Sequence, residues 1–581
     1  MVEMEKLVKN LSKFHCNLAI ISTSLTFFLI SISLIAVNGA PTSGYESSIY
    51  LITPSIFWVS MLLGIFNSIC ILNSCTYSNH KKMWHIAYFQ LIFINILILS
   101  LYSMRGYVYL ERCDTLTYMG LAIDILNKGV CNNNLYPFIS LLLSQISLLS
   151  NISILGISKF LPSLFSLIYL LSIYNWSRSI IDDDRFFSSC VIASCPIFFA
   201  WFSTTIYHML LSILFLPIFF YCIQRNSDYR FRIISIILGI VFPFFHPITA
   251  IMLLIFILTI YIFYEVILNM RSNISLDLIL FYFISLCTWF ISQYILMRNL
   301  SGLILQIIGS LEITSSAMEA QSNLEKLGLI FSLKTILLTS SDEIVYFIIS
   351  ILVILYLVTN RKNMREYSVI VIGVSFFIGN FLYAILFLFS NAHSPIRLIN
   401  LNANMVFAPI LVGYALYNIK VYNIKYEKVL ITLIMILFIS CLFSLYQSPF
   451  VNRPNDQVTL SELSGTDWLI KQKNTNINTA GILTLPERFA DMIYGHAFLL
   501  GRRDLNNDIN IQSAMLQNGN YLSIPSSRYL ILSRLDIEAY TNVWKELKLY
   551  TKESFTNIDN SRNILNIYNN GGLKSFLIII K

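Results

Sequence analysis

Acidic side chains gather in one stretch between about residues 104 and 153, directly after a long apolar segment. This stretch contains Glu111, Asp114 and Asp124. A carboxylate held just above the hydrocarbon of a membrane can take a proton from a hydroxyl group, because partial desolvation raises its basicity. The stretch is therefore a candidate site for general base catalysis, although charges of this kind more often only hydrate a loop.

Histidine and arginine side chains offer a second candidate chemistry, the binding of phosphate. The topology derived below predicts four histidines at or beyond the same membrane face, namely His208, His246, His393 and His496. His393 lies four residues before Arg397. This pairing suits a phosphate, because the guanidinium group offers a planar fork of donors. Each histidine taken alone more often caps or packs against the end of a helix.

Two of the ten cysteines flank the acidic stretch. Cys113 and Cys131 fall in the same loop, whereas the others lie in or near apolar segments, where they act as small hydrophobic residues. Outside the cytoplasm such a pair can form a disulfide, and we predict one here. The sequence contains no HExxH or CxxC spacing, so we predict no metal site and leave the use of a divalent metal open.

The composition indicates the class of protein that carries these residues. Of the 581 residues, 56% are hydrophobic and 12% are charged, and the mean hydropathy is +0.68. Soluble domains carry about 25% charged residues, so the chain is a membrane protein. The net charge is +8, and the basic residues that produce it lie mostly in the loops between apolar segments. This distribution argues against a nucleic-acid-binding role.

Thirteen apolar segments are predicted to span the membrane, since about 20 residues cross the hydrocarbon. They lie near 15–37, 50–74, 84–103, 154–175, 187–204, 207–224, 232–246, 249–270, 278–297, 343–358, 367–390, 399–418 and 428–447. The first is too long for a signal peptide and is read as an uncleaved helix. The apolar segment 135–149 is too short to span, so we predict a helix along the outer membrane surface.

The distribution of Lys and Arg sets the orientation of these segments. Of the 25 basic residues before residue 448, 17 fall in one alternating set of connections. Because cytoplasmic loops carry the excess of positive charge, this set is cytoplasmic. The N-terminus is then inside, and both the acidic loop and the tail are outside.

The charge content rises at residue 448, where we predict a domain boundary between a membrane domain (1–447) and an extracytoplasmic α/β domain (448–581). The tail carries 14 Lys/Arg and 12 Asp/Glu. A helix is expected from Thr459 or Ser461 through Trp468. Strands are expected at 481–485, 529–532, 564–568 and 575–580, the last two forming a hairpin.

Several short motifs together resemble a known superfamily. They are Asp-x-x-x-Tyr at 114–118, the run 124–129, Tyr136-Pro137 and the Lys-Phe-Leu-Pro at 159–162 that opens a span. This order is similar to that of the GT-C integral membrane glycosyltransferases, especially members related to protein mannosyltransferases and the family-39 enzymes. Further motifs resemble archaeal members, namely 244–247, the span entry at Arg397, 465–468 and 567–571.

The resemblance implies a fold, a reaction and a set of site residues. The fold is an all-α polytopic membrane protein with a GT-C-like core over about 90–447. A first-loop Asp or Glu commonly serves as base in that superfamily, which points to Asp114, and polyprenyl- or dolichyl-phosphate sugars are the donors. This chain departs from the family in two extra N-terminal spans and in lacking a second carboxylate at Thr115.

The predicted reaction is an inverting displacement that moves a sugar to a glycan or protein acceptor on the outer face. Arg397 is the main phosphate-binding candidate. The other substrate-binding or phosphate-binding candidates are Arg105, Glu111, Arg112, Tyr118, Asp124, Tyr136, His208, His246 and His393. Asp124 is the closest competitor for the role of base, although its helical spacing also suits a solvated face or a structural partner for Arg112. Two alternatives remain: a transporter or flippase of lipid-linked saccharides, and a non-catalytic scaffold that presents the outer domain.

Overall fold

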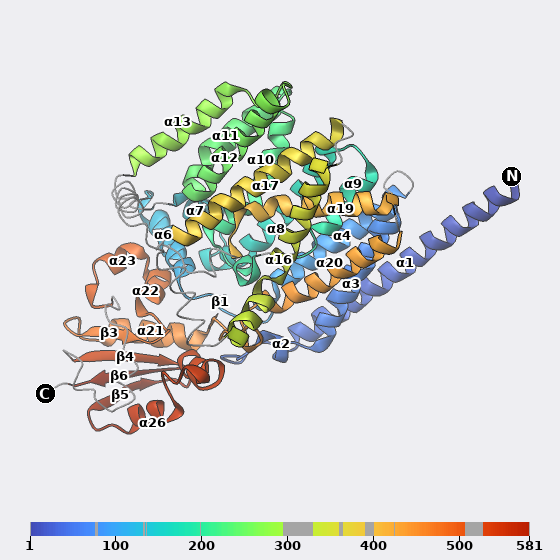
Figure 1. The fold of residues 1–581 in the computed structure, drawn as a ribbon. Helices are drawn as coiled ribbons and strands as arrows, with labels where there is room; N and C mark the ends of the chain where they lie inside the picture. The colour runs from blue at the N-terminus through green and yellow to red at the C-terminus, as the bar shows by residue number, and fades with distance from the viewer. Residues whose placement is uncertain are drawn as a thin grey trace.

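The computed structural model shows a helical membrane protein with a small sheet domain at its C-terminus (Figure 1). It describes residues 2–75, 80–131, 134, 136–197, 199–293, 329–359, 364–389, 400–422, 424–505 and 527–579. The predicted outer loop 298–342 lies largely outside these residues, as do His393 and Arg397.

Eight helices among the described residues are long and apolar enough to cross a membrane. They are formed by α1 (Val2–Asn38), α3 (Ser55–Ser74), α4 (Lys81–Leu99), α8 (Ile154–Ile180), α12 (Pro247–Ile262), α16 (Leu329–Thr359), α17 (Met364–Phe389) and α20 (Ile424–Ser444). The other predicted spans, except one, correspond to shorter helices, α10 (His208–Gln224), α11 (Tyr229–Phe245), α13 (Leu276–Ser292) and α19 (Ala408–Tyr422). The prediction of a multi-pass, mostly helical membrane protein is confirmed.

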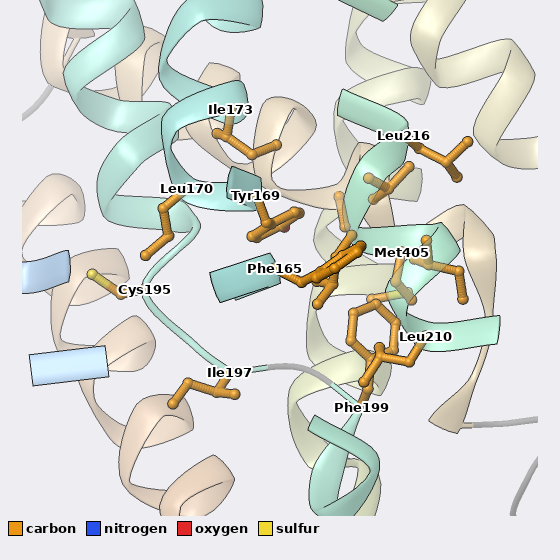
Figure 2. Close-up of a cluster of buried hydrophobic side chains, with 14 of the residues drawn as sticks. Phe165, Tyr169, Leu170, Ile173, Cys195, Ile197, Phe199, Leu210, Leu216 and Met405 are labelled. Carbon is orange, nitrogen blue, oxygen red and sulfur yellow. The ribbon is translucent and has the colours of Figure 1, made fainter. Parts of the chain in front are cut away.

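The exception is the predicted span 187–204, which is wrong as a single helix. Its place is taken by the ten-residue helix α9 (Asp184–Ala193), an irregular segment and a short 3₁₀ helix, η1 (Ala200–Thr204). Figure 2 shows Cys195, Ile197 and Phe199 of this segment among buried hydrophobic side chains. Irregular backbone is tolerated at membrane depth only when protein surrounds it, and the described residues of 194–204 are all buried. Hydropathy alone does not distinguish such a segment from a helix.

The first loop contains two helices, α6 (Asp114–Lys128) and α7 (Pro137–Ser150). Gly129 ends α6 in the left-handed conformation, with φ of 72°, which a residue without Cβ adopts easily. Pro137 is the first residue of α7, where the missing N–H costs nothing. The helix predicted at 135–149 is therefore present, and it packs against α6, α8 and α11.

The C-terminal region forms a four-stranded sheet in the order β3-β4-β6-β5. Its strands are β3 (Asn478–Gly481), β4 (Arg528–Ser533), β5 (Ile564–Asn569) and β6 (Leu573–Ile578). Strand β3 pairs in parallel with β4, and the other pairs are antiparallel, including the predicted β5–β6 hairpin. The expected strand at 481–485 is displaced, because the strand ends at Gly481. The predicted helix is α21 (Leu460–Gln472), and Thr459 and Glu462 form its capping box.

The sheet domain lies against α6 at one end of the helical region (Figure 1). Strand β1 (Tyr109–Leu110) of the first loop pairs with β2 (Gln457–Val458) of the tail. Helix α22 (Pro486–Tyr494) packs on α6 so closely that a Cβ at Gly120 would lie 2.6 Å from the backbone oxygen of Asp491. The C-terminal region therefore fixes the position of the acidic first-loop helix.

Candidate functional site

Helix α6 begins at Asp114 because strand pairing and a side-chain cap fix the backbone of the residues before it. Pairing of β1 with β2 fixes the backbone up to Leu110. Glu111 then turns the chain with a positive φ of 92°, a strained conformation for a residue with a side chain. Its carboxylate accepts hydrogen bonds from the backbone N–H groups of Cys113 (2.9 Å) and Thr115 (3.2 Å), which would otherwise be unsatisfied at the helix start. Glu111 thus acts as the cap that orients Asp114.

Burial raises the pKa of Glu111 from 4.5 to about 7, although its hydrogen bonds with Thr115 and Cys113 oppose this effect. A carboxyl group whose pKa is higher in the folded state binds more protons there than in the unfolded chain. The stability that this group contributes is complete below pH 4.5 and is lost as the pH rises toward 7.

We expect Glu111→Gln to remove this pH dependence. The interval from 4.5 to about 7 corresponds to about 3 kcal/mol of unfolding free energy, so the thermal midpoint of the native protein should fall relative to the variant between pH 5 and pH 8. Thermal unfolding of both proteins across this range provides the measurement. Asp559→Asn, at a more exposed carboxylate paired with Lys574, serves as the control and should not change the profile. A constant difference between native protein and Glu111→Gln would contradict the prediction.

Beside Asp114 lies a group of aromatic and imidazole rings, which we term the His–Tyr cluster: Tyr118, Tyr136, Tyr207, His208 and His246. The ring of Tyr136 stacks on His208 with centroids 4.3 Å apart, and Tyr118 meets His208 edge-on at 4.9 Å. His208 and His246 are 5.1 Å apart. The structure therefore brings together four of the residues that the sequence predicted for the site.

Asp114 is close enough to act on this cluster electrostatically. Burial, and then the negative charge of Asp114, raise the pKa of both Tyr118 and Tyr136. The side chain of Asp114 is 29% exposed, whereas His208 and His246 are each 5% exposed. The carboxylate of Asp114 is thus the accessible part of the site, whereas the two histidines are buried.

The cluster lies where the starts of several helices converge. Asp114 is the first residue of α6 and His208 the first residue of α10, while Tyr136 and His246 are the N-cap residues of α7 and α12. His246 also accepts from the backbone N–H of Thr249 through Nδ1 (3.4 Å). Helix N-termini carry partial positive charge and free N–H groups, which together favour an anion.

The C-terminal region adds an arginine that the sequence did not predict. Arg488 of α22 donates from Nη1 to Thr117 Oγ1 (2.6 Å), and its Nη2 lies 3.5 Å from Asp114 Oδ1. Thr117 in turn donates to the buried Asp491 (2.6 Å). No local pattern marks Arg488, because its partners on α6 lie more than 370 residues earlier in the chain.

Two arginines predicted to bind phosphate are instead engaged in buried structural contacts. Arg105 pairs with Glu46, which also accepts from the Tyr107 hydroxyl (2.5 Å). Arg112 pairs with Glu462 of the C-terminal region at 2.8 Å, and both side chains are at most 3% exposed. Both guanidinium groups thus hold buried ion pairs, and a role of Arg105 or Arg112 in phosphate binding stays a prediction.

Asp124 also faces away from the cluster. Its Oδ2 accepts from the backbone N–H of Ala497 (2.6 Å), at the start of the short helix α23 (His496–Leu500). It therefore joins α6 to the C-terminal region, and the suggested pairing with Arg112 is not observed. His496 lies at the same contact and bonds to Asp491 through Nδ1 (3.0 Å), which raises its pKa.

The predicted disulfide between Cys113 and Cys131 is wrong, since both cysteines are free thiols. Cys113 precedes α6 and Cys131 follows it. A helix of 15 residues is about 22 Å long, whereas bridged cysteines have Cα atoms no more than about 7 Å apart. The two cysteines are close in the sequence, but helix α6 between them keeps them far apart.

The exposed Cys113 provides a test of the predicted orientation. If the first loop lies outside the membrane, a membrane-impermeant maleimide should label Cys113 in intact cells, and Cys113→Ser should remove this label. Peptide mapping by mass spectrometry identifies the labelled site. Labelling of Cys113 only after the cells are permeabilised would show that the first loop lies on the cytoplasmic side, contrary to the predicted orientation.

His393 and Arg397 lie outside the described residues, so their roles stay predictions. Among the residues that the structure does describe, no three His, Cys, Asp or Glu side chains are arranged to hold a metal ion.

No protein-family model matches the chain, and no curated protein matches it. Among solved structures, it is similar to the oligosaccharyltransferase of Archaeoglobus fulgidus in complex with zinc and sulfate, with 13% identity, a TM-score of 0.47, and coverage of 84% of this chain and 72% of that chain. It is also similar to ArnT from Cupriavidus metallidurans bound to undecaprenyl phosphate, with 9% identity, a TM-score of 0.47, and coverage of 85% and 98%.

Proposed function

We propose that this chain is a GT-C-type membrane glycosyltransferase, related to the archaeal mannosyltransferase-like members. It moves a sugar from a polyprenyl- or dolichyl-phosphate-linked donor to a glycan or protein acceptor on the outer membrane face. The observation that supports this function is the convergence of four helix starts at the accessible carboxylate of Asp114 and the His–Tyr cluster.

The convergent helix starts suit the phosphate of the donor. Their partial positive charges favour an anion, and buried imidazoles can donate hydrogen bonds to phosphate oxygens as negative charge develops. His208 and His246 are the residues for this role, and Arg397 and His393 remain proposed phosphate-binding residues. The apolar chain of the donor would stay in the bilayer, so no cytosolic nucleotide-sugar site is needed.

Asp114 would act as the general base. It takes the proton of the acceptor hydroxyl while the acceptor oxygen forms a bond to the anomeric carbon from the face opposite the phosphate. The bond between the anomeric carbon and the phosphate oxygen breaks, and the lipid phosphate leaves with that electron pair. The configuration at the anomeric carbon is inverted.

Transfer can be tested with the full chain reconstituted in liposomes and supplied with radiolabelled polyprenyl-phosphate sugars and candidate acceptors. We expect a new glycosidic bond together with release of lipid phosphate. A flippase would instead move the intact lipid-linked sugar across the bilayer, and a scaffold would do neither. Either of these results would exclude the proposed activity.

A further inference from the structure

A cleft of about 570 Å³ lies between the segment that precedes α3 and one end of the C-terminal sheet. Residues 45–47 and Ile52 form one side of the cleft. The end of β4, the short helix α25 (Arg534–Glu538) and the turn between β5 and β6 form the other side. The volume is in the range of small-ligand sites, about 300–1,000 Å³. The lining includes none of the residues of the candidate active site, so the cleft is a separate feature.

The exposed Arg534 presents an open guanidinium fork to the cleft. Its Nε donates to the carbonyl oxygen of Gly571 (2.8 Å), and its backbone N–H donates to that of Gly572 (3.1 Å). Within the part of the chain that the structure describes, neither Nη group makes a hydrogen bond or an ion pair. An arginine that is held at Nε while its Nη groups stay open loses little further freedom when it donates to a ligand.

Glu538 supplies an acceptor on the same helix. Its Oε2 accepts from the side-chain amide of Asn542 (2.7 Å), whereas its Oε1 has no partner among the described residues. Glu538 lies four residues after Arg534, yet these two side chains do not pair with each other. The cleft therefore offers a free fork of donors together with a free carboxylate oxygen that accepts hydrogen bonds.

The other charged residues of the lining are already neutralised by partners. Glu46 pairs with the buried Arg105, and Lys574 pairs with Asp559 (2.8 Å). The two charges that remain, one guanidinium and one carboxylate, have opposite signs. A ligand with several negative charges, such as a nucleotide, is attracted by an excess of positive charge, which this lining lacks. The cleft is therefore suited to a ligand without net charge.

The rest of the lining is largely apolar. It includes the exposed Ile52, together with Leu532, Ile537 and the aromatic residue Tyr45. A sugar carries hydroxyl groups that both donate and accept around its ring, and it presents apolar C–H groups on its faces. A purely apolar ligand would instead cover the guanidinium and the carboxylate without giving them partners, which is costly. The combination of apolar surface and open polar groups therefore favours a saccharide.

We propose that this cleft binds a neutral glycan. The Arg534 fork donates to oxygens of the glycan, Glu538 accepts from its hydroxyl groups, and the apolar side chains contact the faces of the sugar rings. Because the cleft lies between the membrane region and the C-terminal sheet, the glycan contacts both. The proposal concerns binding alone and does not rest on the proposed function.

The test is glycan binding to the full chain in lipid nanodiscs, followed by saturation-transfer NMR. The neutral probes are maltotriose, mannotriose and chitotriose, and trigalacturonate is the charged probe of similar size. We expect at least one neutral trisaccharide to bind with a Kd below about 10 mM and more tightly than trigalacturonate. Binding of none of the neutral probes, or preference for trigalacturonate, would overturn the proposal.

Two variants test the assigned residues. Arg534→Ala and Glu538→Gln should each weaken binding of the neutral trisaccharide by about tenfold, because each removes hydrogen bonds that involve a charged group. Arg562→Ala and Glu546→Gln are the matched controls, since both side chains are exposed and lie outside the cleft, and both should bind as the native protein does. Unchanged binding in Arg534→Ala and Glu538→Gln would overturn the proposal.

Thermal midpoints of all variants separate binding from a structural role. Arg534→Ala also removes the hydrogen bond to the β5–β6 turn, so a fall in its midpoint would leave the decision to Glu538→Gln. The amide oxygen of that glutamine can still accept from Asn542, so the local structure is kept. Native binding by Glu538→Gln would then overturn the proposal. Glycan binding by a chain that transfers no sugar would leave this inference standing while the proposed function fails, and transfer without binding in the cleft would do the reverse.

Discussion

Replacing Asp114 by asparagine should lower sugar transfer by at least about 100-fold while the protein still folds and binds its donor. The amide keeps the size of the side chain and part of its hydrogen bonding, but it cannot accept a proton at neutral pH. The side chain lies at the start of α6 and is 29% exposed, so its replacement leaves the core intact. The loss should therefore fall on turnover rather than on donor affinity.

The matched control is Asp124→Asn, on the same helix. Because Asp124 holds the backbone N–H of Ala497, this variant should lose thermal stability and keep most of its turnover. Both variants are compared in the liposome assay, with donor binding measured separately. Full transfer by Asp114→Asn, with transfer lost in Asp124→Asn, would move the base to Asp124. Full transfer by both would exclude both predicted bases.

Features encoded in short stretches of sequence were predictable. Apolar runs of about 20 residues identified the membrane helices, and Tyr136-Pro137 marked the start of α7. The Asn-Asn-Gly-Gly turn at 569–572, between two expected strands, identified the β5–β6 hairpin. In each case the determining interactions connect residues near one another in the chain, so the pattern survives without knowledge of the fold.

Partners brought together by the fold were not predictable. Arg112 lies in a first loop rich in charge, as a phosphate-binding residue would, yet its partner Glu462 comes 350 residues later. Cys113 and Cys131 are close in the sequence, but the helix α6 between them separates them in space. Charge and spacing do not indicate whether a side chain is already occupied by a distant residue.

His208 and His246 combine a feature that the sequence predicts with one that it does not predict. His208 and His246 were predicted at the same membrane face because topology counts crossings. That they lie 5.1 Å apart, with Tyr136 stacked on one of them, follows from the packing of α7, α10, α11 and α12. The predicted topology gives the membrane face at which a residue lies, whereas the packing of the helices determines which residues are in contact.

Arg488 is the residue of the site that only the fold reveals, and its replacement carries the second large expected effect. We expect Arg488→Gln to lower turnover by about tenfold or more while donor binding changes little. The guanidinium lies 3.5 Å from Asp114 and donates to Thr117 on the next turn of α6. Without the guanidinium the carboxylate of Asp114 loses its contact with α22, so the base is no longer held in one position for the proton transfer. Arg488 is thus a positioning residue supplied by the C-terminal region.

The design of this experiment has to separate an electrostatic role from a merely structural one, since Arg488 also joins α22 to α6. Arg488→Lys keeps the positive charge beside Asp114 but loses the planar fork, so it should recover part of the turnover that Arg488→Gln loses. Arg502→Gln breaks a comparable pair with Asp504 (2.8 Å) in the same region and should leave turnover unchanged. Turnover and donor binding, with thermal midpoints for all variants, provide the readouts. If turnover falls only in proportion to the thermal midpoint, and Arg488→Lys recovers neither, Arg488 only holds the two regions together and the carboxylate of Asp114 works without its charge.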